Sequence, residues 1–122
     1  MKTKPHGERL TDKQIAAIRR HVADHLSRPV TVDVLAELVG FSPSCFARLF
    51  KQATGVTPHQ FVIEQRIEKA KSLFADDPSM PISRVAAQAG FSDQSHLTRT
   101  FQRVVGQTPG EFIATSRSAA FK

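Results

Sequence analysis

The sequence predicts an all-α fold of seven helices, and three observations support this prediction. No segment alternates apolar and polar residues as a half-buried strand does. Apolar residues instead recur at helical spacing between capping residues and glycine or proline stops. Residues 34–66 and 85–117 are two copies of one pattern, so the helices of the first half return in the second.

The internal repeat also predicts how the helices are organised. With one residue inserted near Gln94, twelve positions of the two copies coincide, whereas roughly two or three would coincide by chance. These positions are Ala36/Ala86, Gly40/Gly90, Phe41/Phe91, Ser42/Ser92, Ser44/Ser95, Arg48/Arg99, Phe50/Phe101, Gly55/Gly106, Thr57/Thr108, Pro58/Pro109, Phe61/Phe112 and Arg66/Arg117. Gly40 and Gly90 stand where the turn of a helix-turn-helix motif needs a positive φ, although an ordinary helix end uses glycine in the same way. The pattern predicts two helix-turn-helix motifs joined by a long central helix.

The first helix is expected over residues 12–27. Thr11 and Gln14 form a capping-box pair at its start, and Pro29 closes it. Its apolar residues recur at helical spacing: Ile15, Ile18, Val22 and Leu26.

The first helix-turn-helix motif comes next in the chain. Thr31 caps a short helix that Gly40 ends. Ser42 and Pro43 then supply the N-cap and the first position of a third helix, which runs to Gly55.

A long helix over residues 58–75 joins the two motifs. The segment Thr57–Gln60 forms another capping box, and the inward stripe is Phe61, Ile67, Ala70 and Phe74. At 1.5 Å per residue this helix spans about 27 Å. Its ends are expected to hold the two motifs about one turn of B-DNA apart, roughly 34 Å, which favours duplex DNA as the partner.

The second half repeats the order of the first. A short helix is expected over residues 82–89. Gly90 ends this helix, and Ser92 or Asp93 caps the next one, which runs to Gly106. A capping box over Thr108–Glu111 then begins the last helix. We divide the chain into a first subdomain with the connecting helix (10–75), a second subdomain (76–117) and two loose tails (1–9 and 118–122).

The charge of the chain indicates a polyanionic partner. Its 17 Lys and Arg and 11 Asp and Glu give a formal net charge of +6, and the pI is about 10.1. No acidic residue occurs between Glu37 and Glu64 or between Asp93 and Glu111. These windows contain Arg48, Lys51, Arg99 and Arg103, so each repeat has an acid-free segment suited to a phosphate backbone.

The composition argues against several classes of protein. Cys45 is the single cysteine, no apolar run approaches the roughly 18 residues of a membrane span, and no signal-peptide core follows the polar start. We therefore expect a soluble, cytoplasmic protein. No catalytic pattern of carboxylates, phosphate loop or Ser-His-Asp spacing is evident, so we expect neither an enzyme nor a cofactor. His21 and His25 stand four residues apart without a third ligand nearby, so no metal site is expected.

The third and sixth helices present polar outer faces. The residues facing outward are Ser44, Cys45, Ala47, Arg48 and Lys51 on the third helix and Gln94, Ser95, His96, Thr98, Arg99 and Gln102 on the sixth. Arg and Gln are typical major-groove readers because they bond guanine and adenine through two hydrogen bonds. The repeated Arg48 and Arg99 favour DNA contact over a merely solvated face. The repeated phenylalanines could stack on bases, but their helical spacing favours core packing.

Phosphate contacts are expected at helix starts and basic side chains. Helix N-termini at Ser42, Thr57, Ser92 and Thr108 offer N–H groups and the positive end of a dipole. The side chains expected at phosphate are Lys51, His96 and Arg103. Arg66 and Arg117 also recur, and either phosphate contact or a salt bridge, for Arg66 with Glu64 or Glu68, would explain them.

The segments LAELVGFSPSCFARLFKQATGVTPHQF and VAAQAGFSDQSHLTRTFQRVVGQTPGEF resemble the DNA-binding domain of the AraC/XylS family of bacterial transcription regulators. The resemblance covers about Leu10 to Arg117. It implies recognition helices that enter successive major grooves on one face of the duplex, and contact with RNA polymerase. Base contacts carry over to Ser44, Ala47 and Arg48 in the first motif and to Gln94, Ser95, Thr98 and Arg99 in the second. The family usually has larger polar side chains around Ser44 and Ala47, so readout by the first motif is expected to rest on Arg48 and a thymine-methyl contact by Ala47.

Three hypotheses about function remain open at this point. The leading one is a sequence-specific, double-stranded DNA-binding transcription regulator, an activator that acts as a monomer. The second is the C-terminal DNA-binding fragment of a larger effector-responsive regulator, because 122 residues leave no room for the effector domain that most family members carry. The third is a helical protein-interaction module that has lost specific readout, which the small side chains of Ser44 and Ala47 favour.

Overall fold

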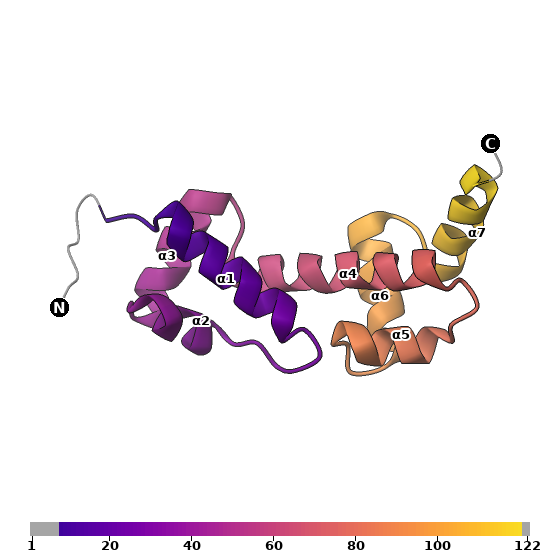
Figure 1. Cartoon of the computed structure of the whole chain (residues 1–122), viewed down its shortest axis with the longest axis horizontal. Coiled ribbons are helices and arrows are strands. Elements are labelled where there is room, and N and C mark those ends of the chain that lie inside the picture. The colour runs from indigo at the N-terminus through magenta and orange to yellow at the C-terminus, as the bar shows by residue number, and fades with distance from the viewer. Residues whose placement is uncertain (1–7, 121–122) are drawn as a thin grey trace. The chain divides into compact units, whose positions relative to one another are not determined.

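The computed structural model describes the backbone of residues 8–120 and the side chains of residues 8–116. This part of the chain contains seven helices and no strand, which confirms the predicted all-α fold (Figure 1). The helices are α1 (Asp12–Asp24), α2 (Val32–Val39), α3 (Pro43–Thr54), α4 (Pro58–Asp76), α5 (Ile82–Ala89), α6 (Gln94–Val105) and α7 (Pro109–Ala120). Within the described residues, no helix is both long and apolar enough to cross a membrane.

Capping boxes set the starts of three helices, as predicted. At α1 the N–H of Gln14 donates to Thr11 Oγ1 at 3.0 Å, and the N–H of Thr11 donates to Gln14 Oε1 at 2.8 Å. The same reciprocal pairs join Thr57 to Gln60 at α4 and Thr108 to Glu111 at α7. Local hydrogen bonds that the sequence encodes within four residues therefore decide where these helices begin.

The first helix ends earlier than the periodicity predicts. The expected end was Ser27, whereas α1 stops at Asp24 with His25 as its C-cap. The N–H of His25 donates to Val22 O, and its ring Nδ1 donates to His21 O at 2.8 Å, so the regular helical ladder stops there. Leu26 is still buried in the core although it lies beyond the helix.

The turns of the two helix-turn-helix motifs have the same backbone geometry. The φ angle is 81° at Gly40 and 94° at Gly90. After each glycine, a phenylalanine N–H donates back five residues to an alanine carbonyl: Phe41 to Ala36 at 3.1 Å and Phe91 to Ala86 at 2.9 Å. Because a side chain is strained at this φ, glycine is needed at both turns.

The chain forms two compact units, one up to Ile63 and one from Glu64. The helix α4 contributes to both cores: Phe61 and Val62 to the first, and Ile67, Ala70 and Phe74 to the second. The division expected from the sequence, at residues 75 and 76, assigns the whole helix to the first subdomain. The two divisions differ because a sequence shows where a helix ends but not which core each of its turns joins.

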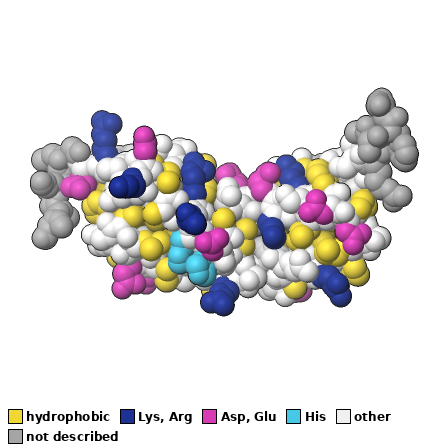
Figure 2. Space-filling view, viewed as in Figure 1, with side chains coloured by type: hydrophobic (Ala, Val, Ile, Leu, Met, Phe, Trp, Pro, Cys, Tyr) yellow, Lys and Arg dark blue, Asp and Glu magenta, His cyan; other side chains and the backbone are white. Residues whose placement is uncertain are grey.

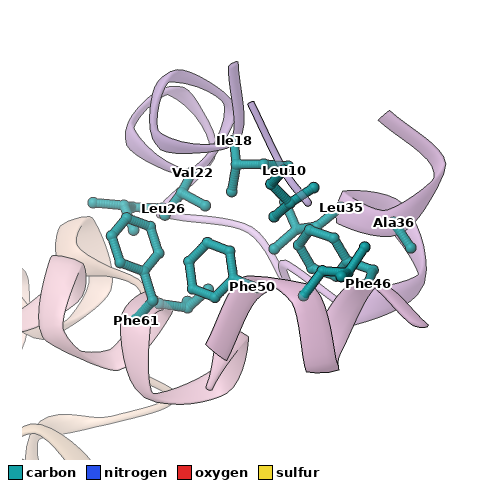
Figure 3. Packing of buried hydrophobic residues seen from close by; sticks show 11 residues of the cluster. Leu10, Ile18, Val22, Leu26, Leu35, Ala36, Phe46, Phe50 and Phe61 are labelled. Atoms are coloured by element: carbon teal, nitrogen blue, oxygen red, sulfur yellow. The ribbon is translucent and has the colours of Figure 1, made fainter. Parts of the chain in front are cut away.

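The first core holds α3 in place (Figure 3). Phe46 and Phe50 of α3 are fully buried, and their ring centroids lie 5.6 Å apart. Phe61 of α4 packs edge-on against Phe50 at 5.5 Å. Side chains from the other elements close the cluster: Leu10, Ile18, Val22, Leu26, Leu35 and Ala36.

The second core holds α6 in the same way. Phe101 of α6 is fully buried between two rings, with Phe74 of α4 at 5.9 Å and Phe112 of α7 at 5.4 Å. Val85 and Ala86 of α5 complete the contact. In each unit, a cluster of buried phenylalanines therefore fixes the orientation of the second helix of the helix-turn-helix motif. This helix is α3 in the first unit and α6 in the second.

The C-terminal helix extends further than expected. The sequence places a tail at 118–122, but α7 runs to Ala120. Alanine has a high helix propensity, so Ala119 and Ala120 are compatible with a helix that continues past residue 118. Residues 1–7 of the other expected tail, residues 121–122 and the side chain of Arg117 lie outside the described part of the chain.

Candidate nucleic-acid interface

The outer face of α3 combines small side chains with two basic ones, Arg48 and Lys51. The core positions Phe46, Leu49 and Phe50 turn Ser44 and Arg48 to solvent and leave Ala47 half-buried. Arg48 Nη2 donates to Cys45 Sγ across 3.6 Å, a weak contact between neighbours on the helix. The predicted outward positions of Ser44, Arg48 and Lys51 are confirmed, whereas Cys45, also expected to face outward, is half-buried and packs against the first core. Base contact by the residues of this face stays a prediction.

The outer face of α6 is richer in polar groups. Gln94, Ser95 and Arg99 are exposed, and Thr98 is half-buried. Thr100 is only 3% exposed, an inward position that the spacing of the apolar residues does not reveal because threonine is polar. Its counterpart in the repeat is the buried Leu49, so the alignment of the two copies contained the signal for it.

The two helices begin with different caps. The hydroxyl of Ser42 accepts from the N–H of Cys45 at 3.3 Å, so α3 has a neutral cap. The sequence left Ser92 or Asp93 open as the cap of α6, and the structure selects Asp93, whose Oδ1 accepts from the N–H of His96 at 2.8 Å. A carboxylate at this end offsets the attraction of the helix dipole for phosphate.

Ser92 is engaged with His96 instead of acting as a cap. Its N–H and its hydroxyl lie 3.3 Å and 3.1 Å from His96 Nδ1. Since a backbone N–H can only donate, Nδ1 accepts, and the proton of the neutral ring lies on Nε2. The ring also packs edge-on against Phe91 at 5.1 Å. The donor that this corner offers to an outside anion is therefore Nε2–H of His96, while both donors of Ser92 are used internally.

The groups that could contact phosphate at Thr57 and Thr108 are not those of the threonines themselves. Both N–H groups are consumed by the capping boxes, and both hydroxyls accept from the third residue of the helix. Proline occupies the first position of α4 and of α7 and has no N–H. The first-turn amides left for an anion are those of His59 and Gly110. The Thr-Pro-x-Gln/Glu pattern in the sequence already indicates which amide is free. Proline at the first position of the helix has no N–H, and the amide of the third position donates to the threonine hydroxyl, so only the amide of the second position is left.

Basic side chains differ in their exposure. Lys51 and Arg103 are exposed beside the outer faces of α3 and α6, as phosphate contact requires. Arg66 is half-buried, and burial lowers the pKa of its guanidinium below the usual value. Glu68, one of the partners expected for Arg66, pairs with Lys71 at 3.2 Å. Phosphate contact and a salt bridge, for example with Glu64, both stay predictions for Arg66.

Figure 2 shows basic and acidic side chains mixed on the side of the first unit that faces the viewer. Lys and Arg side chains alternate there with Asp and Glu, for example over α1. The acid-free windows lie instead in the segments that hold α3 and α6. The local sequence of these helices is thus a better guide to an anionic partner than the net charge.

The remaining candidate groups belong to the packing. The rings of His21 and His25 stack at 4.1 Å, and burial, together with the charge of His25, lowers the pKa of His21. Residues 8–116 contain no group of three or more His, Cys, Asp or Glu placed to hold a metal ion. The repeated phenylalanines pack in the cores, Phe41 partly buried and the others buried, which confirms core packing over base stacking: Phe41, Phe91, Phe50 and Phe101.

Comparison with known proteins places this geometry in a family. A family model described as a helix-turn-helix domain, HTH_18, matches residues 35–115. The chain is similar to the crystal structure of a transcriptional regulator from Chromobacterium violaceum, which is described as an AraC-type DNA-binding domain-containing protein. The TM-score is 0.77 at 26% sequence identity, and the match covers 85% of this chain and 92% of that one. The chain belongs to the AraC-type helix-turn-helix family.

Two further proteins are similar to most of this chain. The DNA-binding domain of AdpA, solved in complex with a target DNA, has a TM-score of 0.77 at 27% identity, over 87% of this chain and 95% of that one. The HTH-type transcriptional activator RhaR of Klebsiella pneumoniae is 34% identical over 113 residues, which are 93% of this chain. The chain spans 38% of the length of RhaR.

Proposed function

We propose that this chain is a sequence-specific, double-stranded DNA-binding transcription regulator whose α3 and α6 enter two adjacent major grooves. The observation that carries the proposal is a pair of acid-free outer helix faces with an exposed arginine at the matched position, Arg48 and Arg99. Each face is presented by its own buried phenylalanine cluster. The AraC-type domain of AdpA, solved on its target DNA, supports duplex DNA as the partner.

The two helices have different roles in base recognition. Arg48 and Arg99 bond guanine O6 and N7, and Gln94 bonds adenine N6 and N7. The other proposed base contacts are Ser44, Ala47, Ser95 and Thr98. These assignments give the first half-site one strong hydrogen-bonding residue and the second half-site several.

Phosphate contacts hold the helices in register. Lys51, Arg103 and Nε2 of His96 reach phosphates beside the grooves. The helix starts at Ser42, Thr57 and Thr108 add backbone donors, through the amides of Ser44, His59 and Gly110. At Ser92 the contact passes through His96, because Ser92 itself is engaged with that ring.

The regulator acts in the cytoplasm as an activator that contacts RNA polymerase, and the chain binds DNA as a monomer. The relative RhaR, a transcriptional activator, supports this sign of regulation. The same proposal holds if the chain is the DNA-binding part of a longer effector-responsive regulator.

A second candidate function is a helical protein-interaction module. Val34 and Leu38 of α2 are 40% and 47% exposed, and Ser44 and Ala47 of α3 are small. Such a module would bind duplex DNA only through its net charge. Its affinity would then be the same for every sequence and would fall steeply with salt.

The deciding experiment is selection of bound sequences from a random duplex pool, followed by titrations of the selected and a scrambled duplex at several salt concentrations. DNA regulation predicts a bipartite, asymmetric motif and a specific affinity roughly 10³-fold or more above the scrambled duplex. Equal affinity for both duplexes at moderate salt would reject specific readout and favour the interaction module.

A further inference from the structure

A hollow lies between the start of α1 and the end of α3, wholly within the first unit. It measures about 400 Å³, and small-molecule sites in proteins occupy roughly 300–1,000 Å³. Its lining residues are Arg9, Leu10, Asp12, Ile15, Leu49, Gln52 and Ala53. None of them is among the proposed DNA contacts, so the proposed function leaves this hollow without a role.

The floor of the hollow is apolar and its rim is charged. Leu10 and Leu49 are buried members of the first core, and Ile15 packs against that core half-buried. Arg9 and Asp12 are exposed at the rim. A small molecule that lies here therefore meets aliphatic carbon below it and one charge of each sign beside it.

The two opposite charges of the rim do not neutralise each other. Arg9 and Asp12 are three residues apart, but Arg9 precedes the N-cap of α1, and no ion pair joins these two described side chains. The hollow beside α6 in the second unit differs in this respect. It is lined by Glu68 and Lys71, which are also three residues apart but lie within one helix and form an ion pair at 3.2 Å. Both charges of the first hollow are thus available to a ligand.

This arrangement selects for one class of ligand. A simple carboxylate is attracted by Arg9 and repelled by Asp12, and a simple amine meets the reverse. A neutral apolar molecule uses neither charge. A zwitterion with an aliphatic side chain satisfies both charges and covers the apolar floor at the same time.

We propose that the hollow between α1 and α3 binds a small zwitterion with an aliphatic side chain, the class to which branched α-amino acids belong. The carboxylate of the ligand pairs with Arg9, and its ammonium group pairs with Asp12. Its side chain lies on Leu10, Ile15 and Leu49. The site is separate from the proposed DNA contacts, so it goes beyond the proposed function and does not rest on it.

The test titrates the full chain with L-leucine at neutral pH and follows the backbone amides by NMR. We expect a Kd on the order of 1 mM, because so small a ligand supplies little binding free energy. The amides that shift should be those of the lining residues, Leu49 and Gln52 among them. Two analogues of the same shape are compared: isocaproate, which lacks the ammonium group, and isopentylamine, which lacks the carboxylate. Each should bind about two- to fivefold more weakly, the effect of losing one solvent-exposed ion pair.

Variants of the full chain assign each ion pair to its residue. Asp12→Asn should weaken the binding of L-leucine and isopentylamine but not that of isocaproate. Arg9→Gln should weaken the binding of L-leucine and isocaproate but not that of isopentylamine. Asp24→Asn is the matched control and should change none of the three, because Asp24 is exposed on the same helix and does not line the hollow. Thermal melts should show that all three variants fold.

Three results would overturn the site. Isocaproate that binds as tightly as L-leucine shows that the ammonium group contributes nothing. Amides of α3 that stay unshifted at L-leucine concentrations on the order of 10 mM show that the hollow is not occupied. Equal losses in Asp12→Asn and Asp24→Asn trace the effect to net charge. Because DNA binding is measured without the amino acid, this site and the proposed function can each fail alone.

Discussion

The two helix-turn-helix motifs share a scaffold and differ in the surface that the scaffold presents. Both have a glycine turn at positive φ and a second helix of 12 residues held by buried phenylalanines. On that helix, however, Ala47 of the first motif corresponds to Thr98 of the second, which carries a hydroxyl, and the second motif has an inserted polar residue near Gln94. A repeated core does not mean a repeated binding chemistry.

The same contrast appears on the first helix of each motif. Val34 and Leu38 of α2 are exposed, and the matching positions of α5 are Arg84 and Gln88. Buried positions must fill one fixed space, so few residues suit them, whereas an exposed position makes few contacts and accepts most residues. The two repeats therefore differ mainly at exposed positions, which are also the positions that can contact a partner.

The largest expected effect concerns the feature that the motifs share. Phe50→Ala and Phe101→Ala should each lower the free energy of unfolding by about 3–5 kcal/mol, because each empties the centre of a phenylalanine cluster. Chemical denaturation measures the loss, with the exposed Gln52→Ala as a control near zero. Amide exchange should speed up first in the unit that carries the substitution. Equal acceleration in both units would mean that the two cores unfold as one.

The next effect separates the two outer faces. Arg48→Ala and Arg99→Ala should each cost about 1–3 kcal/mol in specific binding. Arg99→Ala should relax one base position of the second half-site and leave its neighbours selective. Arg48→Ala should remove the only strong hydrogen-bond readout of the first half-site.

Repeating the selection with each arginine variant measures this difference. Arg20→Ala is the control, because it removes one exposed charge from α1 without touching either outer face. If both arginine variants lose selectivity in the same manner, the proposed asymmetry of readout is wrong.

A smaller effect is expected from exchanging the caps of α3 and α6. Asp93→Ser should strengthen DNA binding and Ser42→Asp should weaken it, each by about 0.3–1 kcal/mol, since a carboxylate at a helix start opposes phosphate there. Stability should hardly change, because serine and aspartate cap helices about equally well. Titrations at low salt measure the two shifts. Shifts of the same sign would show that the caps do not face the phosphate backbone.

The smallest effect tests the exposed pair on α2. Replacing Val34 with Arg and Leu38 with Gln gives α2 the residues of α5 and should change the free energy of unfolding by no more than about 0.5 kcal/mol. Denaturation of the double variant measures this, and Leu35→Ala, at a buried neighbour, provides the contrasting loss of about 2–5 kcal/mol. A loss above 1 kcal/mol for the double variant would mean that the pair packs against the fold after all.

The all-α fold, the two glycine turns and most helix starts follow from the sequence alone. These features depend on residues within about four positions of one another, as in the capping box of Thr11 and Gln14 or the proline after Ser42. The inward faces of α3 and α6 were also predictable, because helical periodicity places Phe50 and Phe101 opposite the polar residues.

Which of several local options the chain uses becomes clear only in the folded molecule. The fold selected Asp93 over Ser92 as a cap, tied Ser92 to His96, ended α1 at Asp24 and divided α4 between two cores. It also brought Thr57 at the start of α4 beside Ala47 of α3. The cap of α6 and the end of α1 depend on competition among donors and acceptors within four residues, which the residue types alone do not rank. The division of α4 between two cores depends on packing between segments that are separate in the chain, which no local pattern of residues records.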